Sequence, residues 1–226
     1  MTERTCAVVE AVVFDMDGTL VDSESVSVAS WRATAAELGF PWPDSVGRTL
    51  IGRNVTSCMK LLTDHLQGDS ELAERAMQLH IDLFNIMAEN DLQLMAGARE
   101  ALQALKGAGM RVGLATSTHR VRAEQRLVRF DLLGAFDAMV FGDEVERSKP
   151  KPDIFVEGAR RLGVEPGRCA AIEDSFNGVR AGHAAGMHVF MVPDLVEPTP
   201  EIASLCDAVL RSLHELPAAL GIAAEK

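Results

Sequence analysis

Several common signatures are missing from this chain of 226 residues. Its 4 cysteines lie far apart and form no C-x-x-C pair, so neither a zinc knuckle nor a redox motif is indicated. The sequence has no run of about 18 apolar residues that could span a bilayer, and no basic, apolar leader precedes the first predicted strand. We therefore expect reduced, mostly buried cysteines and a cytoplasmic protein.

Positive charge is also scarce. The chain has 22 Lys and Arg residues against 33 Asp and Glu, which gives a formal net charge of −11. Nucleic acids and anionic membranes are held by basic surfaces, so we expect neither as a partner. The hydrophobic share of 47% is enough to bury a sizeable core. We expect a soluble monomer or weak homodimer that accepts a small anionic ligand only in a local positive pocket.

The signatures of several enzyme and binding classes are absent as well. No G-x-x-x-x-G-K-[ST] motif occurs, which excludes a P-loop enzyme, and no G-x-G-x-x-G motif opens a helix. The 6 histidines show neither H-E-x-x-H nor another paired spacing, so no catalytic histidine is indicated. An EF-hand is also excluded, because its loop has glycine at the sixth position, whereas Gly18 is at the fourth when Asp15 is counted as the first.

Apolar runs and helical periodicity predict the elements. Residues 7–14 form a β-branched, apolar run typical of a strand that is covered on both faces. Residues 22–94 show helical periodicity, with cap signals at Asn54 and Ser70. The remaining chain alternates between predicted strands over 111–115, 138–141, 169–172, 188–192 and near 208, and predicted helices over 98–106, 119–130, 153–162, 175–185 and at the end.

This alternation predicts an α/β fold with a doubly wound parallel sheet. The first strand has no partner by itself, so it must join that sheet. The helical stretch is then an insertion after the first strand. We expect an α/β core of residues 1–20 and 95–226, interrupted by an α-helical domain of residues 21–94.

Four polar clusters follow predicted strands. They are Asp15 to Thr19, Thr116 with Ser117, Lys149, and Glu173 with Asp174. Each of them has a simple explanation by itself, as a turn, a helix cap or a solvated charge. The ligands of open α/β sheets, however, bind at the carboxyl ends of the strands. The shared position of all four clusters therefore favours a single site.

The acidic residues of these clusters indicate a hard divalent cation. Asp15 and Asp17 are two residues apart, and in an extended backbone both carboxylates point to one side. Two such carboxylates require a nearby cation, or one of them keeps a proton. Mg²⁺ prefers oxygen ligands together with water. We expect a site made by Asp15, Asp174 and the backbone carbonyl of Asp17, with Glu173 beside it.

The remaining polar residues suit a phosphate group. Lys149 brings a positive charge, and the Thr116 hydroxyl can donate a hydrogen bond to a phosphoryl oxygen. Together with a carboxylate nucleophile, a second carboxyl group and a metal ion, they form a phosphoryl-transfer set.

The motifs resemble those of the haloacid dehalogenase superfamily, in its β-phosphoglucomutase-like branch of phosphatases with a helical, C1-type cap. The resemblance runs from about residue 7 to residue 193 and is carried by FDMDGTLVDSE at 14–24, LATS at 114–117, KPKPDIF at 149–155 and IEDSFNG at 172–178. It implies a Rossmann-like core in which the helical insertion is a mobile cap that closes over the substrate.

The resemblance also implies roles for the site residues. Asp15 is expected to be the nucleophile that forms an aspartyl-phosphate, and Asp17 the acid for the leaving oxygen and then the base for water. Thr116 and Lys149 would hold and neutralise the phosphoryl group, while Asp174, with Glu173 beside it, would hold Mg²⁺. The list of expected substrate-binding residues is Ser117, and Arg53 and Asn54 in the cap.

Three functions follow from this pattern. The leading hypothesis is a Mg²⁺-dependent phosphatase of small phosphomonoesters, such as sugar or nucleoside phosphates. The first alternative is a sugar phosphate mutase, although mutases of the branch, and many of its phosphatases, carry a histidine where this chain has Ser27. The second alternative is a non-catalytic, receiver-like phospho-acceptor, although receivers have adjacent acids and no helical insertion. Asp17 separates the chain from dehalogenases and phosphonate hydrolases, which lack this acid.

Overall fold

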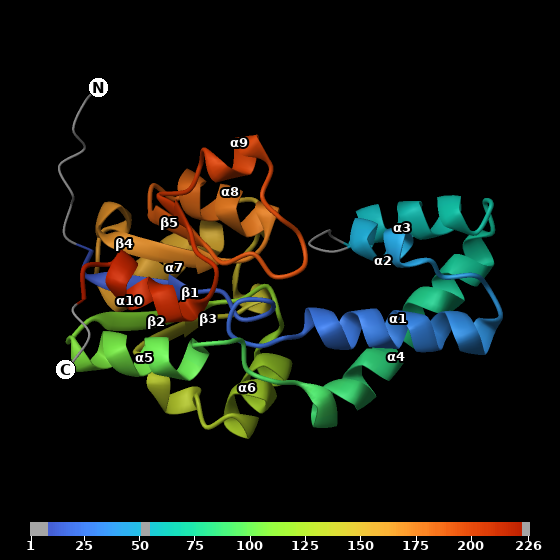
Figure 1. Ribbon diagram of the computed structural model, residues 1–226, viewed down its shortest axis with the longest axis horizontal. Coiled ribbons are helices and arrows are strands. Elements are labelled where there is room, and N and C mark those ends of the chain that lie inside the picture. The colour runs from blue at the N-terminus through green and yellow to red at the C-terminus, as the bar shows by residue number, and fades with distance from the viewer. Residues whose placement is uncertain (1–8, 51–54, 223–226) are drawn as a thin grey trace. The chain divides into compact units, whose positions relative to one another are not determined.

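The computed structural model describes residues 9–50 and 55–222, and the chain divides into two compact units. The larger unit comprises Met1–Val21 and Leu94–Lys226, and the smaller one comprises Asp22–Gln93. The sheet lies in the larger unit, and the smaller unit is built from helices (Figure 1). Within the described ranges, no helix combines the length and the apolar character needed to cross a bilayer.

The larger unit is built on a six-stranded parallel sheet in the order β3-β2-β1-β4-β5-β6. Its strands are β1 (Ala11–Phe14), β2 (Arg111–Ala115), β3 (Ala138–Val140), β4 (Cys169–Glu173), β5 (His188–Met191) and β6 (Ala208–Val209). Strand β1 is central and every one of its residues is buried, as expected for an apolar run covered on both faces. The predicted α/β class with a doubly wound parallel sheet is confirmed.

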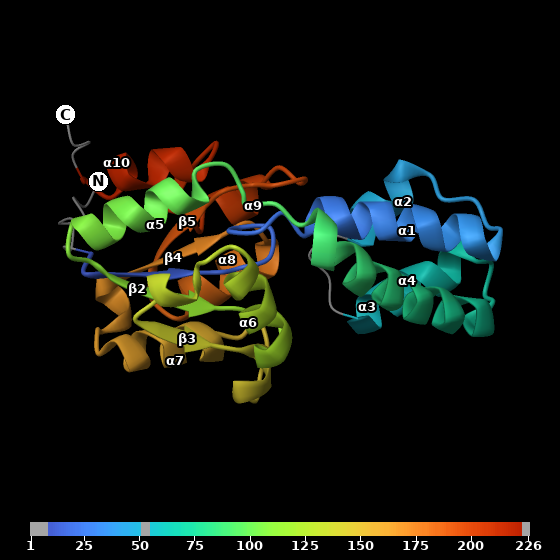
Figure 2. The same cartoon turned by 90° about the horizontal axis from the view of Figure 1, so that it is seen from below.

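Helices cover both faces of this sheet. They are α5 (Ala98–Gly107), α6 (Arg120–Arg129), α7 (Asp153–Leu162), α8 (Phe176–Ala184), α9 (Pro200–Ala203) and α10 (Leu216–Ala219). Figure 2 shows α5 and α10 on one face and α7 on the other. The single-turn 3₁₀ helices are η1 (Leu133–Ala135), η2 (Gly142–Glu144), η3 (Pro166–Arg168) and η4 (Leu213–Glu215).

A hydrophobic core packs α7 against the sheet. Ile154 and Phe155 of α7 are buried together with Val13 of β1 and Ala115 of β2. Helix α8 lies close to the same sheet, because a Cβ atom at Gly182 would come within 2.9 Å of the Ala171 side chain. The absence of a side chain at Gly182 therefore permits close packing of the helix on the sheet.

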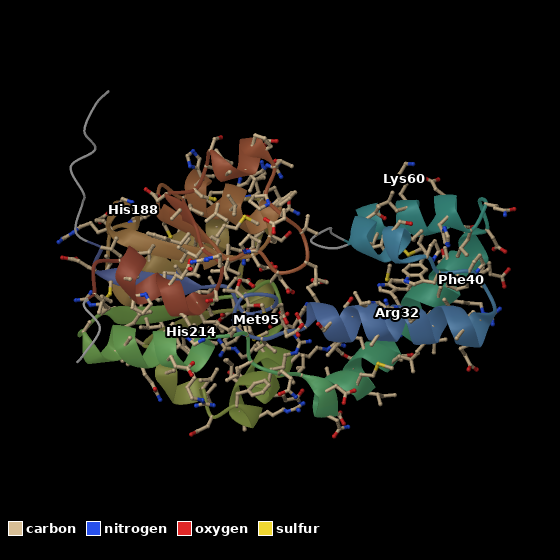
Figure 3. All side chains as sticks on the ribbon, viewed as in Figure 1. Arg32, Phe40, Lys60, Met95, His188 and His214 are labelled. Atoms are coloured by element: carbon tan, nitrogen blue, oxygen red, sulfur yellow. The ribbon has the colours of Figure 1, made fainter. Side chains whose placement is uncertain are left out.

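The smaller unit contains α1 (Glu24–Leu38), α2 (Asp44–Leu50), α3 (Val55–His65) and α4 (Ser70–Asp91). Its core includes Trp31, whose ring stacks on Trp42 and on His80 with centroid distances of 4.8 and 3.9 Å. Burial lowers the pKa of His80 to about 4. Phe40 lies among these helices, whereas Lys60 points outward from α3 (Figure 3).

The structure changes some of the predicted boundaries. Strand β1 begins at Ala11, and the first two residues of the predicted run, 7 and 8, lie outside the described residues. The cap of α4 is Asp69 rather than Ser70, because the Asp69 side chain accepts the backbone N–H of Leu72 at 2.9 Å. The second predicted cap, Asn54, also lies outside the described residues.

Packing under α7 can be tested by truncation. Ile154 is 1% exposed and Val156 on the same helix is 43% exposed. We expect Ile154→Ala to lower the free energy of unfolding by about 2–5 kcal/mol, because it leaves a cavity in the core. The matched variant Val156→Ala should change it by less than about 0.5 kcal/mol. Urea unfolding of both variants measures the difference, and equal effects would contradict this packing.

Candidate active site

Asp15 stands at the carboxyl end of the central strand. It follows β1 directly, and its backbone N–H donates to the Ile172 carbonyl of β4 at 2.9 Å. The order of the sheet reverses between β1 and β4, and open α/β sheets bind their ligands at such a point. The buried, apolar β1 thus holds Asp15 at the edge where a ligand is expected, and the residue itself is 7% exposed.

The loop after Asp15 folds onto Asp174. Gly18 has a φ of 81°, in the left-handed region that favours glycine, and its N–H donates to the Val21 carbonyl at 2.8 Å. A Cβ atom at this position would overlap the Asp174 carboxylate. The hydroxyl of buried Thr19 donates to Asp174 Oδ1 at 3.0 Å. The D-x-D-G-T sequence therefore brings the first and last motifs together.

Lys149 joins the strand ends by charge. Its Nζ forms ion pairs with Asp15 Oδ1 and, at 2.6 Å, with Glu173 Oε1. It also donates to the Ala115 carbonyl at 3.1 Å. The Lys149 side chain is only 7% exposed, and its Nζ lies 5.0 Å from the centre of the Phe155 ring. A single cation thus contacts groups from the ends of β1, β2 and β4.

Glu173 is the most deeply buried acid of the site. Its side chain is fully buried, and its Oε2 accepts hydrogen bonds from the backbone N–H and the hydroxyl of Ser175, at 3.1 and 2.9 Å. A Cβ atom at Gly178 would overlap the Glu173 carboxylate, so the glycine at the start of α8 leaves room for it. Both Glu173 oxygens therefore have partners, which makes this residue a support for Lys149.

Thr116 and Ser117 occupy the turn after β2. Thr116 is 1% exposed, and its Oγ1 accepts the backbone N–H of Thr118 at 3.1 Å. This hydrogen bond occupies a lone pair of Thr116 Oγ1, so the hydroxyl group can still donate its proton to a ligand oxygen. Ser117 is exposed, and a Cβ atom at Gly142 would overlap its backbone carbonyl. The turn is thus packed tightly against η2.

Burial and the charges of neighbouring groups shift the pKa values of Asp15 and Lys149. Burial raises the pKa of Asp15 to about 8, with further increases from Glu173 and Asp17, although Lys149 opposes the shift. Burial by itself would lower the pKa of Lys149, but attraction to Asp15 and Glu173 outweighs it and raises this pKa above its usual range. Additional positive charge beside Asp15 would therefore favour its ionised form.

The carboxylate oxygens around Asp15 are suitable ligands for a hard cation. Carboxylate oxygens of Asp15, Glu173 and Asp174 lie within 4.8 Å of one another. Mg²⁺ takes oxygen ligands of this kind and usually keeps several waters. The Asp17 carboxylate is outside this cluster. The contribution of the Asp17 backbone carbonyl to the metal site remains a prediction. The assignment of Asp15, Asp17, Glu173 and Asp174 to the metal is a prediction as well.

Asp17 has a separate environment that no sequence motif predicts. Its Oδ1 forms an ion pair with Arg126 of α6, and its Oδ2 accepts the Thr118 hydroxyl at 2.7 Å. Thr118 follows the predicted Thr116-Ser117 cluster, so its hydroxyl could have been noted. No motif marks Arg126, because only the fold brings α6 beside the loop after β1. The predicted cap residues Arg53 and Asn54 lie outside the described residues.

Comparison with known proteins agrees with the fold and with the motifs. The model of the haloacid dehalogenase-like hydrolases matches residues 9–186. A phosphorylated carbohydrates phosphatase of Thermotoga maritima is 36% identical over 178 residues, which cover 79% of this chain and 82% of that protein. Hexitol phosphatase B of Escherichia coli is 34% identical over 216 residues and covers 92% of this chain and 94% of its own.

A solved structure extends the agreement to nearly the whole chain. A haloacid dehalogenase family hydrolase from Deinococcus radiodurans, crystallised with bound phosphate and sodium, superposes with a TM-score of 0.81 at 28% identity. The match covers 97% of this chain and 100% of that one. The chain belongs to the haloacid dehalogenase-like hydrolase family. It is an enzyme of the phosphatase class within that family.

The raised pKa of Asp15 predicts a pH-dependent stability in metal-free buffer. An acid whose pKa rises on folding, here from 3.8 to about 8, binds its proton more tightly in the folded state. The stability of the parent protein should therefore fall as pH rises through that interval. Asp15→Asn removes the titrating group. We therefore expect the Tm of this variant to rise relative to the Tm of the parent as pH increases, by several degrees in total, because 1 kcal/mol corresponds to about 2–4 °C.

Thermal unfolding between about pH 4 and pH 8 measures this difference. Asp131→Asn is the matched control, since it removes an exposed carboxyl group from the same unit at a backbone position with a φ of 55° that asparagine tolerates. A Tm difference for Asp15→Asn that stays constant over this interval would contradict the raised pKa.

Proposed function

We propose that the chain hydrolyses small phosphomonoesters, such as sugar or nucleoside phosphates, with Mg²⁺ and through an aspartyl-phosphate on Asp15. The observation that carries the proposal is the position of Asp15, which lies beside Lys149 at the end of the central strand. A carboxylate nucleophile, a fixed cation and a hydroxyl donor form the set that phosphoryl transfer requires. The phosphatase relatives support the same reaction class.

The reaction has two steps in this proposal. First, an oxygen of Asp15 attacks phosphorus, the bond between phosphorus and the ester oxygen breaks, and the proton of Asp17 passes to the leaving oxygen. Second, water attacks the phosphorus while Asp17 takes up one of its protons. The bond between phosphorus and Asp15 then breaks, which releases inorganic phosphate and restores the Asp15 carboxylate.

The other residues of the pocket serve the phosphoryl group. Lys149 neutralises its charge, and the Thr116 hydroxyl donates to one of its oxygens. Asp15 and Asp174 would hold Mg²⁺, next to Glu173, and the bound ion would supply positive charge for the phosphoryl oxygens. A cation bound here would also favour the ionised form of the nucleophile, because burial raises the pKa of Asp15.

The helical unit is proposed to select the substrate. The larger unit supplies groups for the phosphoryl end of a substrate and for proton transfer, so recognition of the remaining part falls to another region. We assign it to the smaller unit, as the family's cap, and keep Ser117 of the larger unit as a further substrate contact. Arg53 and Asn54 remain candidates for the cap contacts.

Hydrolysis is favoured over transfer to a second sugar hydroxyl. The two relatives described above are phosphatases. Ser27, which stands where mutases of the branch and many of its phosphatases carry a histidine, weakens the mutase alternative without by itself establishing hydrolysis. Product analysis separates the reactions, since a phosphatase releases inorganic phosphate and a mutase returns an isomeric sugar phosphate. Mutase activity with a hexose phosphate and no net phosphate release would overturn the proposal.

The substrate class can be tested with a panel of esters. Phosphate release is measured with glucose 6-phosphate, ribose 5-phosphate, glycerol 3-phosphate, uridine 5′-monophosphate and p-nitrophenyl phosphate, each with Mg²⁺ and with a chelator. We expect release from at least one alkyl ester and a loss of about 100-fold or more on chelation. Unchanged rates in the chelator would remove Mg²⁺ from the proposal.

The nucleophile can be tested by substitution. Because the uncatalysed reaction is extremely slow, Asp15→Asn should lower kcat by at least about 10⁴-fold. Asp17→Asn should also suppress turnover, but it leaves the nucleophile intact. With p-nitrophenyl phosphate, whose leaving group needs no proton, it should still form a phosphoprotein that hydroxylamine cleaves. An Asp15→Asn protein that keeps the parent rate, once contaminating phosphatase is excluded, would refute the covalent mechanism.

A further inference from the structure

The carboxyl group of Asp17 is held at both oxygens. Arg126 forms an ion pair with Oδ1, and the Thr118 hydroxyl donates to Oδ2 at 2.7 Å. The two contacts come from different parts of the fold, since Thr118 lies in the turn after β2 and Arg126 lies on α6. The side chains of Asp17 and Arg126 are 25% and 12% exposed, so this ion pair is largely shielded from water.

The position of Arg126 is fixed by the helix that carries it. Ala123 and Leu127 of α6 are fully buried and anchor the helix to the core. The start of α6 is held to η2, because the backbone N–H of Arg120 donates to Asp143 at 2.9 Å and the Arg120 guanidinium pairs with Glu144 at 2.7 Å. Arg126 thus reaches Asp17 from a helix that is anchored at its start and along its buried face.

The chemistry of the two partners differs. A guanidinium only donates hydrogen bonds, so the oxygen facing Arg126 must remain an acceptor in both protonation states of Asp17. A hydroxyl both donates and accepts, so Thr118 can turn its oxygen toward a proton on Oδ2. A proton carried by Asp17 is therefore accommodated on Oδ2 and excluded from Oδ1 while the ion pair lasts.

We propose that Arg126 is a positioning residue that holds Oδ1 of Asp17, so that Oδ2 is the oxygen that passes the proton to the leaving group and takes it from water. The inference rests on the proposed function, because it assigns an atom to its proton transfer. No sequence motif predicts it, since Arg126 has no marked spacing to Asp17. Loss of Arg126 frees the carboxyl group to rotate, and misplacement of a reacting group by about 1 Å can cost about 100-fold in rate.

Two esters with different leaving groups test this role. An alkyl leaving oxygen must be protonated as it departs, whereas p-nitrophenolate is stable as an anion and needs little help from an acid. kcat/KM reports the steps up to cleavage of the ester. It is measured with p-nitrophenyl phosphate and with the alkyl ester from the panel above that the parent hydrolyses fastest. A merely structural role would lower both values by the same factor.

We expect Arg126→Ala to lower kcat/KM by about 10-fold or more with the alkyl ester and by less than about threefold with p-nitrophenyl phosphate. Thr118→Val, which removes only the hydroxyl, should show the same selectivity. Arg126→Lys keeps the charge without the planar geometry and should recover part of the loss with the alkyl ester. Arg122→Ala removes an exposed arginine from the same helix and should leave both values at the parent level.

The outcomes separate this inference from the proposed function. Equal losses with both esters, no loss, or a gain with the alkyl ester would overturn the role of Arg126. A parent protein that hydrolyses neither ester would refute the proposed function instead. Thermal unfolding of each variant shows whether it is folded, and if Arg126→Ala is not, Arg126→Gln carries the same expectation because it keeps most of the side-chain length and loses the charge.

Discussion

The buried ion pairs of Lys149 with Asp15 and Glu173 are the interaction on which the rest of the site depends. A buried lysine requires an anionic partner, and buried carboxylates require a cation, so removal of Lys149 would leave two buried acids without their cation. The two acids come from adjacent strands, and Lys149 from the segment after β3. The ion pairs can therefore form only when β1 and β4 are neighbours, which links the topology of the sheet to the chemistry of its edge.

Asp15 and Asp17 are two residues apart but have different environments. Asp15 is buried against Lys149, which suits a nucleophile in a pocket for a phosphoryl group. Asp17 is more exposed and contacts Arg126 and a hydroxyl, which suits a group that exchanges a proton with substrate and water. Pairs of carboxyl groups with such divergent surroundings are a general basis for separate roles in catalysis. The D-x-D sequence brings the two acids together, and the strand ends around them make them different.

The sequence predicts the fold class and most strands within one or two residues, because buried parallel strands are short apolar runs. It also predicts that Asp15, Lys149, Glu173 and Asp174 meet, since each follows a strand. The contact of Arg126 with Asp17 could not be predicted, because it depends on the packing of α6 and not on a spacing. The hydrogen-bond partners of Glu173 could not be predicted either, since a short sequence motif does not show which carboxylate oxygen faces which donor.

The order of the strands also governs how the chain can fold during synthesis. Strand β1 is made first, yet its partners β2 and β4 begin only at Arg111 and Cys169. At about 5–20 residues per second, roughly 8 to 30 seconds pass between the end of β1 and the end of β4 on the ribosome. The helices of residues 22–93 emerge in this interval and make mainly local contacts. They can therefore fold before both partner strands of β1 have been synthesised. Until then, a fully apolar segment that is central in the native sheet is exposed to other chains and to chaperones.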